Sequence, residues 1–200
     1  SLTIIDYNMY SPERYDLMKK YAKRHYNLDH ANLINPKIIV VHYTASSSLK
    51  ISLQTFESIY VPKERQKLSA YGEVNVSTHY LIAKNGEIYQ LLPTTLMARH
   101  AIGYNHTSIA IENVGAGEEG LTRKQVLANV HLIHYLTTQH PSIEYLFGHM
   151  EYMNQTFDHF PLFLELDKEY DPLIKIDPGW RFMKRLRMLL KQEYDLELKK

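Results

Sequence analysis

Blocks of apolar residues separated by polar stretches run along the 200-residue chain and predict a mixture of strands and helices. The segment Lys37-Ile-Ile-Val-Val-His42 has four consecutive β-branched apolar residues, which is typical of a central strand covered on both faces. Further strands are expected at residues 76–82, 87–92 and 108–112. The Asn85-Gly86 dipeptide between the first two of these predicts a hairpin turn.

A helix is expected near the N-terminus. Ser11 suits the N-cap position and Pro12 suits the first helical position. Apolar residues then recur on one face of this helix, at Tyr15, Met18, Ala22 and Tyr26. Because Asn35-Pro36 separates the helix from the first strong strand, we interpret residues 1–36 as an N-terminal helical extension.

We interpret residues 37–200 as one α/β domain in which helices flank a single mixed β-sheet. A short helix is expected over residues 53–59, a capped helix over residues 122–139 and a final helix over residues 178–190. The cap of the second is a capping box formed by Thr122 and Gln125. No apolar run approaches the roughly 18 residues that span a bilayer, so we expect a soluble protein without a transmembrane segment.

Composition narrows the chemistry that this domain can perform. The chain has 23 Lys and Arg against 22 Asp and Glu, so its net charge of +1 gives no general attraction for nucleic acid. It has no Cys, which excludes disulfides, thiolate nucleophiles, iron–sulfur clusters and cysteine-based zinc fingers. A transition metal would therefore need His, Asp or Glu ligands, and the chain contains eleven His.

Three metal-competent side chains stand where apolar or turn segments give way to loops. His42 ends the first strong strand, His149 follows an apolar segment, and Asp177 precedes a Pro-Gly turn. Two His and one carboxylate would leave a tetrahedral zinc one open position for water. Each residue also has a structural alternative, as a hydrogen-bonded His or a turn-forming Asp, and their wide separation leaves the choice open.

Six stretches that occur in order between residues 37 and 190 carry a family resemblance. They are Val40-Val-His-Tyr-Thr-Ala45, Val76-Ser-Thr-His-Tyr-Leu-Ile82 with Asn85-Gly-Glu-Ile88, His100-Ala101, Asn105-His-Thr-Ser-Ile-Ala-Ile-Glu112, Phe147-Gly-His149 and Lys175-Ile-Asp-Pro-Gly179. Together they resemble the zinc-dependent N-acetylmuramoyl-L-alanine amidases, a family that includes the peptidoglycan recognition proteins. The AmpD-like branch is the most similar.

The resemblance implies a role for each matching residue, and it implies an amidase fold. The zinc ligands would be His42, His149 and Asp177. Glu112 would orient and deprotonate the attacking water, and Lys175 would stabilise the oxyanion. Two further residues, His100 and Asn105, would contact substrate in the cleft.

The implied reaction is hydrolysis of the amide bond between N-acetylmuramic acid, in its intact or 1,6-anhydro form, and L-alanine. The implied partner is peptidoglycan or a muropeptide, and we expect a monomer. A periplasmic or secreted location is favoured, with cytoplasmic recycling left open. Two alternatives remain. One is a non-catalytic muropeptide-binding module, against which the complete set of ligands with Glu112 and Lys175 argues. The other is an interaction protein, which would bind no metal.

The chain also departs from the family pattern. Arg99 precedes the His-Ala pair where an aromatic residue is common, and Thr78 stands where the recognition-protein and phage branches have a Tyr. Residues 150–174 form an insertion between two of the implied ligands, rich in Tyr, Phe, Asp and Glu. This insertion is interpreted either as a lid or wall of the cleft, or as a packed excursion.

Overall fold

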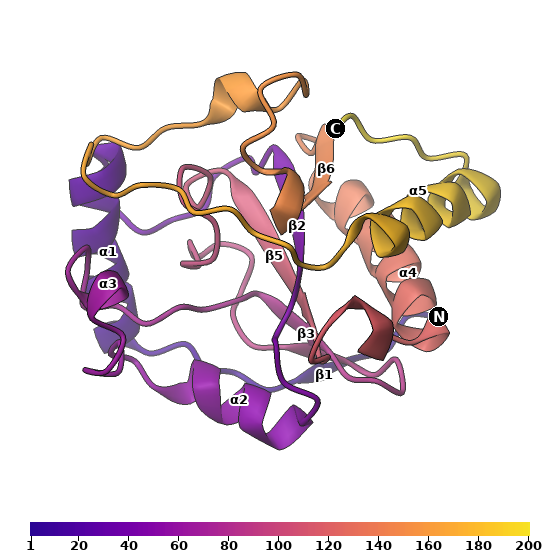
Figure 1. Ribbon diagram of the computed structural model, residues 1–200, viewed down its shortest axis with the longest axis horizontal. Coiled ribbons are helices and arrows are strands. Elements are labelled where there is room, and N and C mark those ends of the chain that lie inside the picture. The colour runs from indigo at the N-terminus through magenta and orange to yellow at the C-terminus, as the bar shows by residue number, and fades with distance from the viewer.

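The computed structural model describes residues 1–200 and has the α/β architecture that the sequence predicts, a six-stranded mixed sheet flanked by helices (Figure 1). Across the sheet, the strands lie in the order β1 (Ile4–Asp6), β4 (Ile88–Gln90), β3 (Tyr80–Ile82), β5 (Ser108–Asn113), β2 (Ile38–Tyr43) and β6 (Tyr145–Gly148). Only β3 and β4 are antiparallel, and they are joined by the expected Asn85-Gly86 turn. All other neighbours are parallel.

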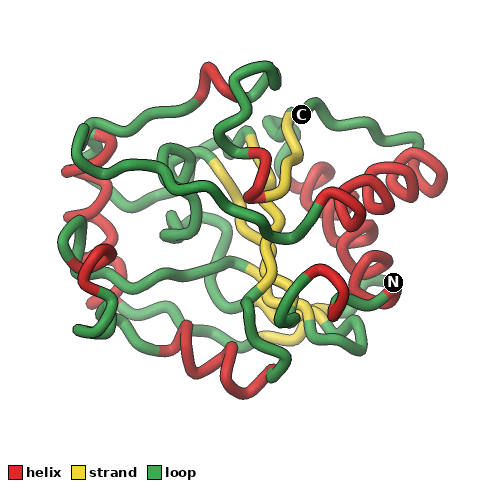
Figure 2. The backbone as a smooth tube through the Cα atoms, in the orientation of Figure 1, coloured by secondary structure: helices red, strands yellow, loops and turns green.

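Helices cover the two faces of the sheet unequally. They are α1 (Pro12–Tyr26), α2 (Leu49–Glu57), α3 (Gln66–Ser69), α4 (Arg123–Gln139) and α5 (Trp180–Tyr194). Figure 2 shows α4 and α5 side by side on one side of the strands, with loops on the other side and α1, α2 and α3 at its outer edge. A helix of the length and apolar character that crossing a bilayer requires is absent.

The alternation of side chains along β2 assigns its residues to the two faces. Ile39 and Val41 join the large core cluster that includes the buried residues of α4 and α5. Ile38 and Val40 belong to a smaller cluster on the opposite face. Because successive strand residues point to opposite faces, His42 continues the second series and lies away from α4 and α5.

Several short elements differ from the sequence-based expectation. The strand β1 was not expected, and it pairs with β4 at the edge of the sheet. α2 begins at Leu49 because the Ser48 side chain caps it by accepting a hydrogen bond from Ile51 N–H at 3.2 Å. α3 lies within a stretch expected to be loop. α5 begins after Gly179, whose φ of +108° suits glycine, and continues to Tyr194.

The N-terminal segment is closely integrated with the rest of the chain. Besides β1, it carries the expected helix α1, and the capping role of Ser11 is confirmed by the hydrogen bond from Arg14 N–H. The buried surface of α1 is wider than the sequence predicts, because Leu17, Tyr21 and His25 are buried as well as three of the four predicted residues; the fourth, Tyr15, is half-buried. The boundary placed at residue 36 stays a prediction.

The insertion of residues 150–174 packs against α1. In Figure 1 it runs from β6 over the molecule to α1 and returns in front of the sheet towards α5. His25 Nδ1 lies 2.6 Å from Glu165 Oε2, and Leu166 N–H donates to the His25 carbonyl at 3.0 Å. The Tyr170 ring stacks on that of Tyr71, with 4.3 Å between ring centroids. The insertion is therefore a packed part of the fold.

The buried ion pair between His25 and Glu165 gives a testable contribution to stability. We expect Glu165→Ala to lower the free energy of unfolding by about 3 kcal/mol, because breaking a buried pair leaves the other partner uncompensated. The exposed Lys37–Glu144 pair offers a matched control, since Glu144→Ala should cost less than about 1 kcal/mol. Urea unfolding monitored by circular dichroism measures both values. If both variants lowered the free energy of unfolding by the same amount, the buried pair would stabilise the fold no more than the exposed pair does.

Candidate active site

Three neighbouring parallel strands bring functional side chains to one edge of the sheet. In the register of β2 and β5, His42 is paired with Glu112. On the other side of β2, Val41 is paired with Gly148 of β6, so the following residue, His149, lies next to His42. The crevice outside the carboxyl ends of parallel strands is a usual location for ligand sites.

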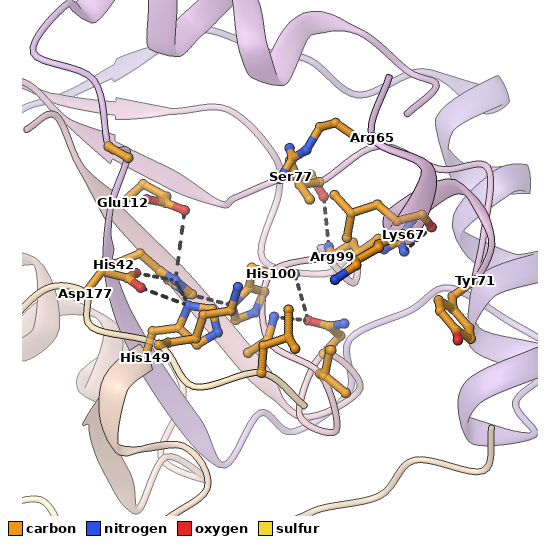
Figure 3. Close-up of a pocket in the computed structure, with 18 of the residues that line it drawn as sticks. His42, Arg65, Lys67, Tyr71, Ser77, Arg99, His100, Glu112, His149 and Asp177 are labelled. Atoms are coloured by element: carbon orange, nitrogen blue, oxygen red, sulfur yellow. Dashed lines mark hydrogen bonds and ion pairs between the residues drawn. The ribbon is translucent and has the colours of Figure 1, made fainter. Parts of the chain in front are cut away.

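The third predicted ligand reaches the same place from the far end of the insertion. Asp177 is held beside His149 by its carbonyl, which accepts a hydrogen bond from Met150 N–H at 2.8 Å. The distances are 3.0 Å from His42 Nδ1 to His149 Nδ1, 3.2 Å from His42 Nδ1 to Asp177 Oδ2, and 3.3 Å from His149 Nδ1 to Asp177 Oδ1. These three residues form the one group in the protein that could hold a metal ion (Figure 3).

The electrostatics of this group suit metal binding. Burial lowers the pKa of His149 to about 4, assisted by the neighbouring His42, so the imidazole is neutral at pH 7. Burial alone would raise the pKa of Asp177, but hydrogen bonds from His149 and His42 hold it well below the ordinary value. The neutral His149 imidazole beside the ionised Asp177 carboxylate supplies donor forms that a divalent cation requires.

Glu112 lies beside the three candidate ligands and has an unusual environment. Its Oε1 is 4.0 Å from His42 Nδ1, and its Oε2 is buried without a hydrogen-bond partner. Burial, together with the nearby charge of Asp177, raises the pKa of the Glu112 carboxyl well above its ordinary value. A carboxylate with an unpartnered oxygen and a raised pKa accepts a proton more readily than an ordinary carboxylate does.

Lys175 precedes Asp177 by two residues and is half-buried in the wall of the same cavity. It makes no ion pair with an acidic residue. Its positive charge contributes to lowering the pKa of His149, which places the ammonium within electrostatic reach of the candidate ligands.

The two residues predicted to contact substrate have clear partners within the protein. His100 Nδ1 lies 2.9 Å from His42 Nε2, and His100 Nε2 lies 3.0 Å from Ser108 Oγ. Asn105 Oδ1 accepts hydrogen bonds from the backbone N–H groups of His100 and Ala101. His100 and Asn105 line the cavity, so substrate contact by them stays a prediction.

The candidate ligands lie at one end of a cavity of about 540 Å³. In Figure 3, His42, His149, Asp177 and Glu112 are grouped at one end, whereas Arg65, Lys67 and Tyr71 lie at the other. Residues of the insertion, Glu169, Tyr170, Asp171 and Leu173, also line the cavity. The insertion is thus both a packed segment and a wall of the cleft, which combines the two interpretations of the sequence.

The far end of the cavity was not expected from the sequence. Arg65, Lys67 and Tyr71 belong to the polar stretch around α3, which carries no motif. Arg99, noted as a departure from the family pattern, is buried, and its guanidinium donates to the carbonyls of Leu68, Gly72 and Val74. It also donates to Tyr170 Oη, so it joins the α3 region to the insertion.

Comparison with known proteins matches this architecture. The family model described as N-acetylmuramoyl-L-alanine amidase matches residues 32–171. The solved structure of the selenomethionine derivative of AmpD is 24% identical, with a TM-score of 0.56 over 92% of this chain and 93% of that one. The amidase LysC from Clostridium intestinale URNW is 23% identical, with a TM-score of 0.50 over 78% of this chain and 87% of that one.

A peptidoglycan recognition protein has the same fold. PGRP-SA of Apis mellifera is 17% identical, with a TM-score of 0.51 over 96% of each chain. At these levels of identity the structural matches establish the fold. No curated protein sequence matches the chain.

Proposed function

Because the chain belongs to the N-acetylmuramoyl-L-alanine amidase family, we propose that it is a zinc-dependent hydrolase of peptidoglycan. The bond cleaved is the amide between N-acetylmuramic acid, intact or 1,6-anhydro, and the L-alanine of the stem peptide. The observation that carries this proposal is the complete group of His42, His149 and Asp177, with the unpartnered Glu112 oxygen beside it. A peptidoglycan substrate favours a periplasmic or secreted location, and cytoplasmic recycling of wall fragments fits the same chemistry.

The donor atoms of the candidate ligands fit zinc. A tetrahedral zinc with bonds of ~2.0–2.2 Å has ligand atoms roughly 3.3–3.6 Å apart. The separations of 3.0, 3.2 and 3.3 Å among His42, His149 and Asp177 are close to this range. Two imidazoles and one carboxylate form a set of three protein ligands that leaves one position open, as in catalytic zinc sites.

Each remaining side chain of the site has a task in amide hydrolysis. When bound, zinc lowers the pKa of water towards about 7 and polarises the amide carbonyl. Glu112 accepts the proton of the attacking water and passes it to the nitrogen of the leaving L-alanine, a transfer that its raised pKa favours. The Lys175 ammonium opposes the negative charge that develops on the former carbonyl oxygen. Residues of the insertion form one wall of the cleft in which these groups lie.

The alternative is a muropeptide-binding module without turnover, a possibility kept open by the fold shared with PGRP-SA. The presence of Glu112 and Lys175 beside the three candidate ligands favours the hydrolase, because binding alone requires neither a proton carrier nor a group to stabilise an oxyanion.

Digestion of purified muropeptides, analysed by mass spectrometry, tests the proposal. We expect the zinc-loaded protein to release free stem peptides that begin with L-alanine. We also expect a chelator to stop this release and added zinc to restore it. Intact and 1,6-anhydro muropeptides tested in parallel reveal the preferred sugar. Recovery of bound but uncleaved muropeptide would support the binding module, and cleavage that persists in full after metal removal would contradict the mechanism.

A further inference from the structure

The segment that leads from the insertion into α5 has two sides with different surroundings. Leu173, Lys175 and Asp177 line the cavity of the candidate active site. Ile174 and Ile176, which alternate with them, do not line this cavity and are 96% and 72% exposed. The wall of the cleft therefore has an apolar outer side that the rest of the chain leaves in contact with solvent.

This apolar side continues onto the first turn of α5, which the chain enters after crossing in front of the sheet (Figure 1). Trp180 is 63% exposed and lines a groove together with Ile176. Exposed apolar side chains that lie next to one another on a protein surface mark interaction sites. Ile174, Ile176 and Trp180, which we call the apolar group, are therefore candidates for contact with a partner.

Three unpaired cations, which we call the cationic stripe, lie beside the apolar group on α5. Arg181, Lys184 and Arg185 are exposed and follow the three- and four-residue spacing of one helical face. The ion pairs of this helix are formed by two other cations, so the stripe has no acidic partner. The Arg181 guanidinium lies 5.4 Å from the centre of the Trp180 ring and joins the stripe to the apolar group.

We propose that this surface docks the protein onto an anionic lipid bilayer, with the cationic stripe at the phosphate headgroups and the apolar group in the interfacial layer. A soluble polyanion would pair with the cations but would leave Ile174 and Ile176 in water. A saccharide would stack on the Trp180 ring but would make no use of the three cations. A bilayer surface uses both sets, because its headgroups attract cations and apolar side chains enter beneath them.

Acidic side chains limit this surface on one side. Glu118 and Glu119 line the groove that contains Trp180, and the Glu118 carboxylate accepts a hydrogen bond from Phe182 N–H at 3.1 Å. Anionic lipid would therefore contact the side of Trp180 that faces Arg181. Because the apolar group lies on the outer side of the wall, docking leaves the inner side, which lines the cavity, free for substrate. The inference does not depend on the proposed function.

The fluorescence of Trp180 reports directly on docking, because the chain has no other tryptophan. We expect its emission to shift to shorter wavelength when phosphatidylglycerol vesicles are added to the wild-type protein, and to stay unchanged with phosphatidylcholine vesicles. Added salt should weaken the binding, because it screens the exposed cations. Co-sedimentation with the same vesicles measures the affinity of each variant.

Substitution of two cations tests the cationic stripe. We expect Lys184→Gln combined with Arg185→Gln to weaken binding to phosphatidylglycerol vesicles roughly 25-fold, since each cation near an anionic membrane surface contributes about a fivefold factor. The matched control is Lys19→Gln combined with Lys20→Gln, which removes two exposed cations of α1. This control should bind the vesicles as the wild-type protein does.

Substitution of one isoleucine tests the apolar group. We expect Ile174→Ser to weaken binding by about tenfold, because the variant no longer buries this apolar side chain in the interfacial layer. Ile34→Ser, at a loop isoleucine that is 60% exposed, should leave the affinity unchanged. Wild-type affinity in Ile174→Ser would show binding by charge alone, as to a soluble polyanion, and would overturn the inference.

Three further results would also contradict docking on lipid. They are an unchanged Trp180 emission with phosphatidylglycerol vesicles, an equal loss of affinity in the test and control variants, and a shift of the emission by chitin oligosaccharides that vesicles do not produce. The last result would assign the groove to a saccharide. None of these measurements uses a muropeptide, so a lack of amidase activity would contradict the proposed function and leave this inference standing.

Discussion

Replacing Glu112 with Gln is expected to lower the rate of muropeptide hydrolysis by a factor of roughly 10² to 10⁴, the contribution typical of a general base. The amide has almost the same shape as the carboxyl group but cannot accept the proton of the attacking water. The fold and the zinc content should be unchanged, because Glu112 Oε1 stands 4.0 Å from His42 Nδ1, farther away than the candidate ligands are from one another. Hydrolysis rates and metal analysis of the same preparation measure both properties.

Glu87→Gln is a matched control for this substitution. Glu87 is an exposed residue whose carboxylate accepts a hydrogen bond from Tyr89 Oη, outside the cavity, so its variant should hydrolyse muropeptides at the wild-type rate. If Glu112→Gln also retained the wild-type rate, the role of proton carrier would have to be assigned to another group.

Removing His42 is expected to abolish both zinc binding and hydrolysis. Loss of a residue that only orients a ligand costs ~10–100-fold in metal affinity, so loss of one of three ligands should cost more than ~100-fold. The wild-type protein should contain about one zinc per chain, as a single site with three protein ligands requires. We expect His42→Ala to contain almost none, and metal analysis after gel filtration measures the difference.

His131→Ala is the corresponding control. His131 is an exposed histidine on α4 that contacts Tyr194 Oη, and it does not line the cavity. The variant should keep its zinc and its activity. A fully active, zinc-containing His42→Ala protein would exclude the proposed metal site.

The sequence predicts the long and strongly patterned elements of this fold well. The four apolar residues before His42 form β2, and the Thr122–Gln125 capping box begins α4 as expected. The elements that escape prediction are β1, α3 and β6, which have three or four residues and are too short to establish a periodicity. β1 depends on its pairing with β4, and α3 depends on the hydrogen bond that the Arg99 guanidinium donates to the Leu68 carbonyl.

The candidate site depends on contacts between distant parts of the chain, which limits what the residues alone can predict. The positions of His42, His149 and Asp177 after apolar or turn segments single them out as possible metal ligands, and the family resemblance strengthens that assignment. The structure brings their donor atoms within 4.8 Å of one another. No sequence motif indicates that both ring nitrogens of His100 have hydrogen-bond partners, in His42 and Ser108. It arises because the loop after Arg99 folds back over β5, where Ser108 begins the strand.

The buried contact between His25 and Glu165 joins positions 140 residues apart. It therefore limits which segments of this chain could be replaced by those of a relative in a chimeric protein. The family match covers residues 32–171, so it includes residues 150–171 of the insertion but leaves out α1, on which the insertion rests. A chimera that lost the insertion would expose the side of α1 on which the insertion packs, and one that lost α1 would leave Glu165 buried without His25 as its partner. The N-terminal helix and the insertion therefore stabilise each other, and a functional chimera would have to exchange both together.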